Sequence, residues 1–182
     1  MYPFIRMAWQ MFKHRNDPRL GFEDVHVSQH YCLPWDLDMW RELNNGRTLT
    51  LFDLGRIPLA MRVGLADVLR RNRWGLTMAG ATVRYRRRVR AFHKVEMHSR
   101  ALGHDGRFIY LQQSMWRGGE ALNSVVYRSA VTSKNGIVPV AEVLEAMGAT
   151  GWNPPLPDWV QAWADVEAMR QWPPEDLPRE SA

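Results

Sequence analysis

Two acidic residues and two amides stand close together in the first third of the sequence, where they could carry out chemistry. Asp36 and Asp38 are followed by Asn44 and Asn45, and a helical pattern of apolar residues begins directly afterwards. A helix start offers unpaired N–H donors and the positive end of the helix dipole, which together stabilise a developing oxyanion. A carboxylate held a few ångströms away could activate water or attack a carbonyl itself. The pattern therefore indicates acyl transfer to water.

The helix that must position these residues is predicted to begin at Asn44 or Asn45. Either asparagine is a good N-cap, because its side-chain oxygen can accept a hydrogen bond from a free backbone N–H. Leu51 and Leu54 fall on one face of this helix, and Pro58 is expected to kink it or to begin a second helix. A purely structural interpretation stays open, in which the aspartates stabilise the turn and the asparagines only cap the helix.

Strand-like segments surround the predicted helix. Residues 24–33 alternate enough to predict a first strand. After Gly75, glycine-containing turns separate further strands and favour antiparallel hairpins; these four strands are predicted at 76–89, 92–102, 107–116 and 121–132. A strand, a long helix and four strands predict an α+β fold, in which a sheet of about five antiparallel strands buries one face against the helix.

Both ends of the chain extend beyond this core of about 24–132. The apolar N-terminal segment around Phe4 to Met11 favours a packed helix over a membrane anchor. A short helix is predicted at 140–147, and residues 1–150 are expected to form one domain. Residues 151–182 are expected to add a proline-rich bend, an amphipathic helix at 158–172 and a tail of about ten residues whose prolines favour disorder.

The acidic loop and the helix start resemble a known motif. Residues 35–47 read WDLDMWRELNNGR, which resembles the D-x-D-x-x-G-H-V-N-N-x-x-Y pattern of the hotdog-fold thioesterases, in particular their 4-hydroxybenzoyl-CoA thioesterase-like branch. Residues 79–87, AGATVRYRR, resemble a later strand of the same family. The resemblance extends from about 24 to 131. It implies a hotdog fold, with an antiparallel sheet wrapped around a long central helix, and hydrolysis of acyl-CoA or acyl-carrier thioesters.

The resemblance also assigns roles to individual residues. Asp38 matches the catalytic carboxylate, which acts as nucleophile or general base on the thioester carbonyl, and the backbone N–H of Asn45 matches the oxyanion donor. Arg41 and Glu42 replace the glycine and histidine of the pattern, and Thr48 replaces its tyrosine. The acyl specificity of the family can therefore not be carried over, and Glu42 is a candidate second carboxylate that positions water.

The remaining candidate residues would bind the substrate. Asp36, Glu42, Asn44 and Gly46 complete the expected substrate-binding set around the loop. Alternate side chains of a strand share one face, so an arginine row that includes Arg86 and Arg88 could hold the phosphates of coenzyme A. The other members of that row are Arg84 and Arg90. A solvated outer face of the sheet is the alternative for these arginines.

Composition agrees with an anionic partner without identifying it. The formal charge is +5, and 21 of the 24 basic residues are arginines, whose planar side chains bind phosphate and carboxylate in pairs of hydrogen bonds. Net charge alone does not choose among nucleic acid, an acidic membrane surface and a phosphate-bearing small molecule.

Several other classes lack support in the sequence. His26 and His30, four residues apart on a predicted strand, would be about 13 Å apart and could not share a metal ion. The HExxH, GxSxG and GxxxxGK[ST] patterns do not occur, so neither a metal nor a cofactor is expected. Cys32 is expected to be a free structural thiol. We expect a cytoplasmic protein that is not integral to a membrane, because no apolar run reaches about 18 residues and no secretory cleavage pattern is present.

Three function classes follow from these observations. The favoured class is a thioesterase, and the resemblance implies a homodimer, or a tetramer of two dimers, whose sites combine both chains. The alternative is a non-catalytic protein of the same fold that binds acyl-CoA or an acyl carrier. The third class is a nucleic-acid or membrane-surface module, suggested by the charge and the Trp-rich terminal helix. Tryptophans at helical spacing are more typical of a core, so no nucleic-acid partner is expected.

Overall fold

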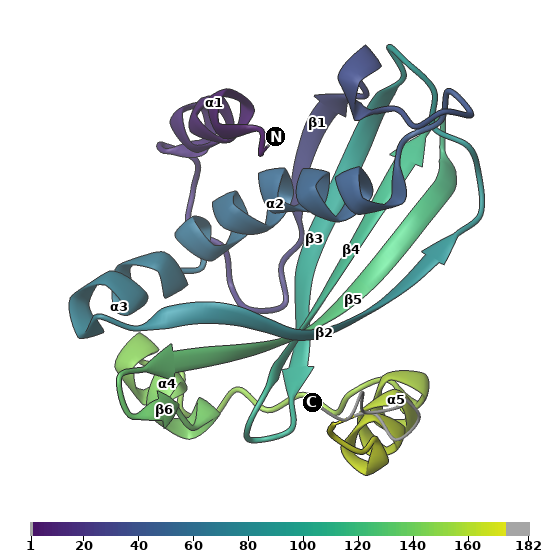
Figure 1. Ribbon diagram of the computed structural model, residues 1–182. Helices are drawn as coiled ribbons and strands as arrows, with labels where there is room; N and C mark the ends of the chain where they lie inside the picture. Colours follow the sequence, from purple (N-terminus) through teal and green to yellow (C-terminus); the bar gives the residue numbers. More distant parts are fainter. Residues whose placement is uncertain (1, 174–182) are drawn as a thin grey trace, which may run out of the picture.

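The computed structural model, which describes residues 2–173, is an antiparallel sheet curled around one long helix (Figure 1). Most of the tail that the sequence predicts to be disordered lies outside the described residues. Five strands form the sheet in the order β1-β3-β4-β5-β2. Their bounds are β1 (His26–Tyr31), β2 (Gly75–Tyr85), β3 (Lys94–His104), β4 (Ile109–Arg117) and β5 (Glu120–Ser133), and a short β6 (Gly136–Ile137) pairs with β5. All of these pairings are antiparallel, which confirms the predicted α+β class.

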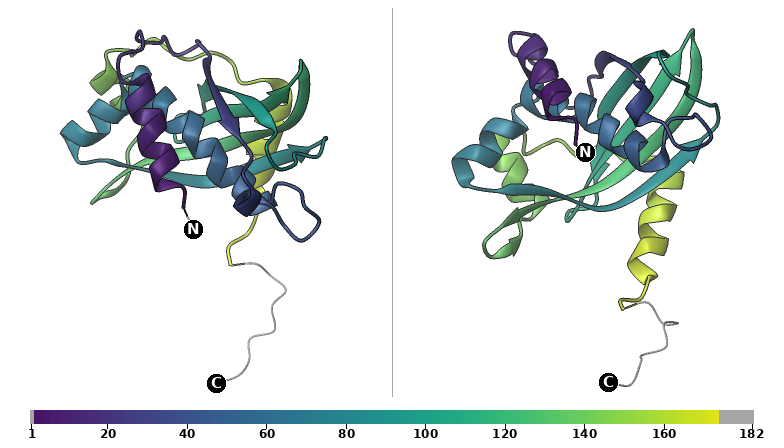
Figure 2. Two further views of the ribbon diagram at one scale, coloured as in Figure 1. Left: turned by 90° about the horizontal axis from the view of Figure 1, so that it is seen from above. Right: turned by 45° about the horizontal axis from the view of Figure 1, so that its top comes forward.

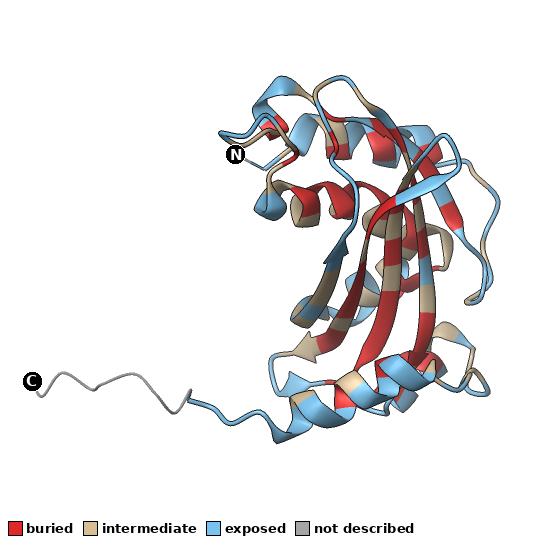
Figure 3. Ribbon diagram, turned by 90° about the vertical axis from the view of Figure 1, so that its right-hand side faces the viewer, coloured by how far each residue is buried: buried red, intermediate tan, exposed pale blue. Residues whose placement is uncertain are grey.

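The long helix α2 (Asn45–Arg62) lies across the concave face of the sheet (Figures 1 and 3). Its buried face presents Leu51, Phe52 and Leu54 to the sheet, each no more than 1% exposed. Gly55 is the point of closest approach, because a Cβ atom there would meet Met97 Sδ and Ser99 Oγ at 2.7 Å each. The absence of a side chain at this position therefore lets α2 lie directly on β3.

Helix α2 continues through Pro58, so no second helix begins there, which was one of the two expected outcomes. Pro58 is buried inside α2, and its ring removes only one backbone hydrogen bond, the one that an N–H at this position would donate to the carbonyl of Leu54. The chain breaks instead at Gly64, whose φ of 85° is easy for glycine and unfavourable for other residues. A second helix, α3 (Leu65–Asn72), starts directly after it.

A second apolar layer covers the opposite face of the sheet. The helix α5 (Asp158–Met169) lies on the side of the sheet away from α2 (Figure 2), and its Val160 and Ala164 pack against strand residues that include Tyr110. Ile109 and Leu111 point to the α2 side, so β4 is buried on both faces. Helix α5 ends at Met169, three residues earlier than the helix predicted at 158–172. The short helix α4 (Val140–Met147) has the predicted bounds.

The N-terminal helix α1 (Phe4–His14) packs beside β1 and the start of α2 (Figure 1). It contacts the rest of the protein through Met7, Gln10 and His14, all of which are buried. Arg6 reaches across to the loop after β1. None of the helices within residues 2–173 is long and apolar enough to cross a lipid bilayer.

Candidate active site

The acidic loop between β1 and α2 is a closed turn that fixes its own backbone. A short 3-10 helix, η1 (Pro34–Asp36), follows β1. The N–H of Asp38 then donates to the carbonyl of Glu42 over 2.8 Å, and Arg41 takes a left-handed conformation with a φ of 59°. Oδ1 of Asp38 accepts from the N–H groups of Trp40 at 2.9 Å and Glu42 at 3.3 Å. The half-buried carboxylate of Asp38 is thus held by one oxygen, while Oδ2 makes no hydrogen bond within residues 2–173.

Asp36 is fully buried and holds the loop to α1 and α2. Its carboxylate accepts from Arg6 over 2.7 Å, from Arg47 over 2.6 Å and from the N–H of Leu33 over 3.0 Å. Burial alone would raise the pKa of Asp36, but the hydrogen bonds from Leu33, Arg47 and Arg6 outweigh it and lower the pKa below its usual value. Both oxygens accept hydrogen bonds that hold the loop in place, and the expected role of Asp36 in binding substrate stays a prediction.

The start of α2 leaves one amide open. Asn44 is the N-cap, and its Oδ1 accepts from the N–H groups of Gly46 at 2.9 Å and Arg47 at 3.1 Å, as the sequence predicts. The amide of Gly46 is therefore not free to bind a substrate. Asn45 is the first helical residue, and no hydrogen bond from its N–H is formed within the described part of the chain. That amide is the candidate oxyanion donor.

A cavity of about 240 Å³ opens beside this amide. It brings together Glu42, Asn45, Arg86 and Arg88, four of the residues that the sequence selects. The N–H of Leu43 donates to the carbonyl of Val89 over 2.8 Å, which ties the acidic loop to the arginine segment. The complete lining is Glu42, Leu43, Asn45, Thr48, Tyr85, Arg86, Arg87, Arg88, Val89 and Asn123, and it includes neither Asp36 nor Asp38.

The arginines reach the cavity by a different geometry from the predicted one. Strand β2 ends at Tyr85 and not at Val89, because the N–H groups of Arg86 and Arg87 both donate to the carbonyl of Leu122 and the regular ladder stops. Strict alternation is lost there, so consecutive residues 86–88 line the cavity. Nε of Arg88 forms an ion pair with Glu42 over 3.0 Å, and Arg87 pairs with Glu120. The predicted single-face row through Arg90 is therefore not formed.

Three polar residues of the lining are not selected by sequence reasoning. Thr48 lies one turn into α2, and the hydroxyl of Tyr85 donates to the carbonyl of Asn45 over 3.4 Å. Asn123 lies on β5, and its Oδ1 is buried without a hydrogen-bond partner among the described residues. A polar residue inside the apolar run ALNSVVY is the signal that could have identified Asn123.

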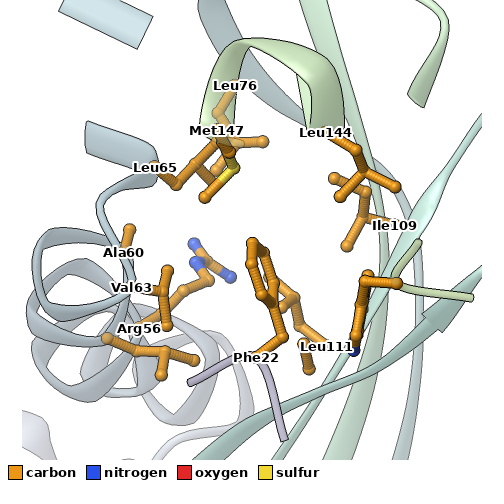
Figure 4. A pocket seen from close by; sticks show the side chains of 13 residues that line it. Phe22, Arg56, Ala60, Val63, Leu65, Leu76, Ile109, Leu111, Leu144 and Met147 are labelled. Carbon is orange, nitrogen blue, oxygen red and sulfur yellow. The ribbon is translucent and has the colours of Figure 1, made fainter. Parts of the chain in front are cut away.

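A second cavity lies further along α2, between this helix, α4 and the sheet (Figure 4). Twelve apolar residues line it, among them Phe22, Leu111 and Met147, together with one charged residue, Arg56. The guanidinium of Arg56 points in among these side chains (Figure 4), pairs with Asp53 and lies 4.4 Å from the ring centre of Tyr127. The free space is only about 40 Å³, enough for a few atoms.

The histidines of β1 take part in hydrogen bonds and not in an ion site. Nδ1 of His26 lies 3.0 Å from Arg62, and Nε2 of His30 lies 2.7 Å from the hydroxyl of Ser28. Burial lowers the pKa of His26 to about 4 and that of His30 to about 3, with nearby cations adding to the effect. Residues 2–173 contain no group of three or more His, Cys, Asp or Glu side chains that could hold a metal ion.

Comparison with known proteins identifies the class. A model of the thioesterase-like superfamily matches residues 32–164, so the chain belongs to that superfamily. Protein THEM6 of Drosophila melanogaster is 29% identical over 167 residues, which cover 90% of this chain and 84% of that protein. Its name gives no activity.

Solved structures agree with this assignment at the level of the fold. The probable thioesterase YbaW from Escherichia coli superimposes with a TM-score of 0.61 at 16% identity, over 67% of this chain and 98% of that one. A Staphylococcus aureus protein solved in complex with CoA has a TM-score of 0.60 at 9% identity, over 78% of this chain and 92% of that one. The chain therefore has the hotdog thioesterase fold that its loop motif resembles.

Proposed function

We propose that this protein hydrolyses acyl-CoA or acyl-carrier thioesters at the cavity beside the start of α2. The observation that carries the proposal is the amide of Asn45. This N–H lies at the N-terminal end of an 18-residue helix and has no acceptor within residues 2–173. The next two N–H groups, those of Gly46 and Arg47, donate to the side chain of Asn44. An open amide at a helix N-terminus stabilises the negative charge that develops on a thioester carbonyl oxygen.

The proposed carboxylate is Asp38. A nucleophile or general base needs one oxygen that is free and one that fixes its orientation. Oδ1 of Asp38 is held by two backbone amides, and Oδ2 is open. Asp38 does not line the cavity itself, so the proposal requires the thioester carbonyl to reach the adjoining turn, where Oδ2 would attack it or take a proton from water. Glu42 lies on the same turn and lines the cavity, where its ion pair with Arg88 suits it to position water.

The arginines suit the coenzyme end of the substrate. Residues 86–88 present three guanidinium groups at one side of the cavity, and only Glu42 and Glu120 oppose them there as ion-pair partners within residues 2–173. Arg86 makes no ion pair within the same residues and is exposed. Arginine binds phosphate oxygens through pairs of charge-assisted hydrogen bonds, so this segment suits the phosphates of CoA or of a carrier's pantetheine arm.

Thiol release from a panel of acyl-CoA esters tests the proposal. We expect free CoA and free acid in equal amounts for at least one ester of the panel, with no dependence on added metal. Saturable binding of the same esters without release of thiol would instead support the non-catalytic alternative. If no ester is bound or cleaved, the proposed function is wrong.

Substitution of Arg86 and Arg88 should weaken substrate binding more than it slows chemistry. We expect the Arg86→Gln/Arg88→Gln protein to raise KM for acyl-CoA about tenfold or more, with a small change in kcat, because the phosphates lose charge-assisted contacts. The effect should shrink as salt is added, since salt screens exposed charges. Arg70→Gln/Arg71→Gln is the matched control, because it removes two positive charges from exposed arginines on α3. An equal change in the control would show that only net charge matters.

The homodimer or tetramer stays a prediction. Strand β2 is at the edge of the sheet and pairs only with β5 among the described strands. An edge strand offers a row of free backbone groups to another strand. A second copy could pair there, and it would then add residues beside the arginine segment that follows β2.

A further inference from the structure

The polar and apolar faces of helix α1 are reversed compared with those of an ordinary surface helix. Its polar residues at i, i+4 and i+8, namely Arg6, Gln10 and His14, face the protein. Four of its large apolar residues face outward, with exposures of 71% for Phe4, 88% for Ile5, 59% for Trp9 and 54% for Phe12, whereas Met7 is buried. A surface helix normally has the opposite arrangement.

The polar contacts under α1 keep the helix in this orientation. Arg6 donates to the buried carboxylate of Asp36 and to the carbonyl of Tyr31, each over 2.7 Å. His14 lies 2.6 Å from Asp17, and its ring packs edge-on against that of His26 at 4.7 Å. Rotation of the helix to bury its apolar face would break this ion pair and these contacts. The outward apolar face is therefore a fixed feature of the fold.

The loop after β1 carries two further exposed apolar side chains. Trp35 and Trp40 are 70% and 73% exposed, and Arg6 joins α1 to this loop. We call the combined set, Phe4, Ile5, Trp9, Phe12, Trp35 and Trp40, the N-terminal apolar surface. On α1 the rings of Trp9 and Phe12 stack with their centres 6.0 Å apart, and exposed apolar patches of this kind mark surfaces that are covered by a partner or by lipid.

We propose that the N-terminal apolar surface docks on an anionic lipid bilayer, with α1 lying flat in the headgroup region. Three features select lipid as the occupant. Tryptophan, which supplies three of the six residues, favours the boundary between headgroups and acyl chains. Lys13 and Arg15 are exposed at the C-terminal end of α1, and residues 2–16 contain no aspartate or glutamate. Basic residues beside an apolar helix face bind anionic headgroups.

The dimensions of α1 suit this position. Its 11 residues correspond to about 16 Å, roughly half the hydrocarbon thickness of a bilayer, so the helix would lie along the surface. Tyr2 contacts Asp53 on α2, and Arg6 contacts the loop that carries Asp38. The docked face would thus stand beside the start of α2. The proposal does not depend on the proposed function, because it rests on the exposed surface alone.

Co-sedimentation with vesicles tests the docking. The full-length protein should bind vesicles of mixed phosphatidylglycerol and phosphatidylcholine, and weakly or not at all those of pure phosphatidylcholine. Binding should fall as salt rises. The Ile5→Ser/Trp9→Ser/Phe12→Ser protein should bind at least about tenfold more weakly. Lys13→Gln/Arg15→Gln should weaken binding about fivefold or more.

A matched control uses the exposed apolar residues of α5. Trp159, Val166 and Met169 are 53%, 59% and 73% exposed, so their replacement by serine removes a similar apolar area from the other side of the sheet. We expect this control to bind as the wild type does, with unchanged circular dichroism in both triple variants. The proposal is overturned if the wild type does not bind the anionic vesicles, or if the α5 control loses as much vesicle binding as the α1 variant. It is also overturned if the α1 variant only converts an oligomer into a monomer, since the surface would then cover a second copy.

Discussion

Asp38→Asn should abolish thioester hydrolysis without unfolding the loop. The asparagine retains an Oδ1 atom that can accept from the N–H groups of Trp40 and Glu42, so the turn keeps its backbone contacts. It loses the negative charge and the basic oxygen that the proposed mechanism requires. We expect kcat to fall by about three orders of magnitude or more, with KM almost unchanged. Steady-state kinetics on the best ester of the panel, with thermal unfolding as the check on folding, measures both.

Glu42→Gln provides the comparison within the same turn. Because Glu42 is proposed only to position water, its amide variant should lose about tenfold in kcat, much less than Asp38→Asn. A larger loss for Glu42→Gln than for Asp38→Asn would transfer the catalytic role to Glu42, which lines the cavity directly. Full activity in both variants would contradict the proposed mechanism.

Asp36→Asn should be the most destabilising of the substitutions considered. Asp36 is fully buried, and its charge is balanced by Arg6 and Arg47, whose side chains are only 20% and 18% exposed. Removal of the carboxylate takes away the buried negative charge that Arg6 and Arg47 both contact, which costs about 3 kcal/mol of unfolding free energy. Denaturant unfolding measures this loss. Asp67→Asn, which breaks only exposed ion pairs on α3, should cost less than about 1 kcal/mol.

The carboxylate of Asp36 should also make the free energy of unfolding depend on pH in the acid range. The folded pKa of Asp36 lies below its ordinary value of 3.8, so its contribution is fully present above that value. The contribution is lost as the pH falls through the folded pKa, because both states then bind the proton. The difference in unfolding free energy between the wild type and Asp36→Asn should therefore narrow below about pH 4. A difference that stays constant down to pH 2 would mean that folding does not shift the pKa of Asp36.

The elements that carry the fold could be predicted from local patterns. Alternation and glycine turns identify all five strands within a few residues, and the asparagine before an apolar period identifies the start of α2. The errors fall where long-range contacts override local preference. Pro58 does not end the helix, because the buried face of α2 continues on both sides of it. Strand β2 stops at Tyr85, because two amides share the carbonyl of Leu122.

The residues of the candidate site could be predicted only in part, because long-range contacts decide their roles as well. Spacing along one segment limits the cap to Asn44 or Asn45, and the family resemblance selects the amide of Asn45. Spacing cannot distinguish the two aspartates, because the ion pairs of Asp36 with Arg47 and with Arg6, thirty residues earlier, form only in the folded chain. Asn123 enters the cavity from β5, and no local pattern links it to the loop at 36–45. Contacts between distant segments decide these roles, and a single sequence does not contain them.

Gly55, in the middle of α2, restricts how related sequences can vary, because it has no side chain. Gly55 precedes no turn and has no unusual backbone angle, yet any Cβ atom there meets Met97 and Ser99. A relative with alanine or serine at this position must carry smaller or displaced side chains on β3, or its helix must rise from the sheet and lift the amide of Asn45 away from the arginines. We expect these three positions to vary together across homologous sequences, and chimeras that mix them to lose turnover before they lose the fold.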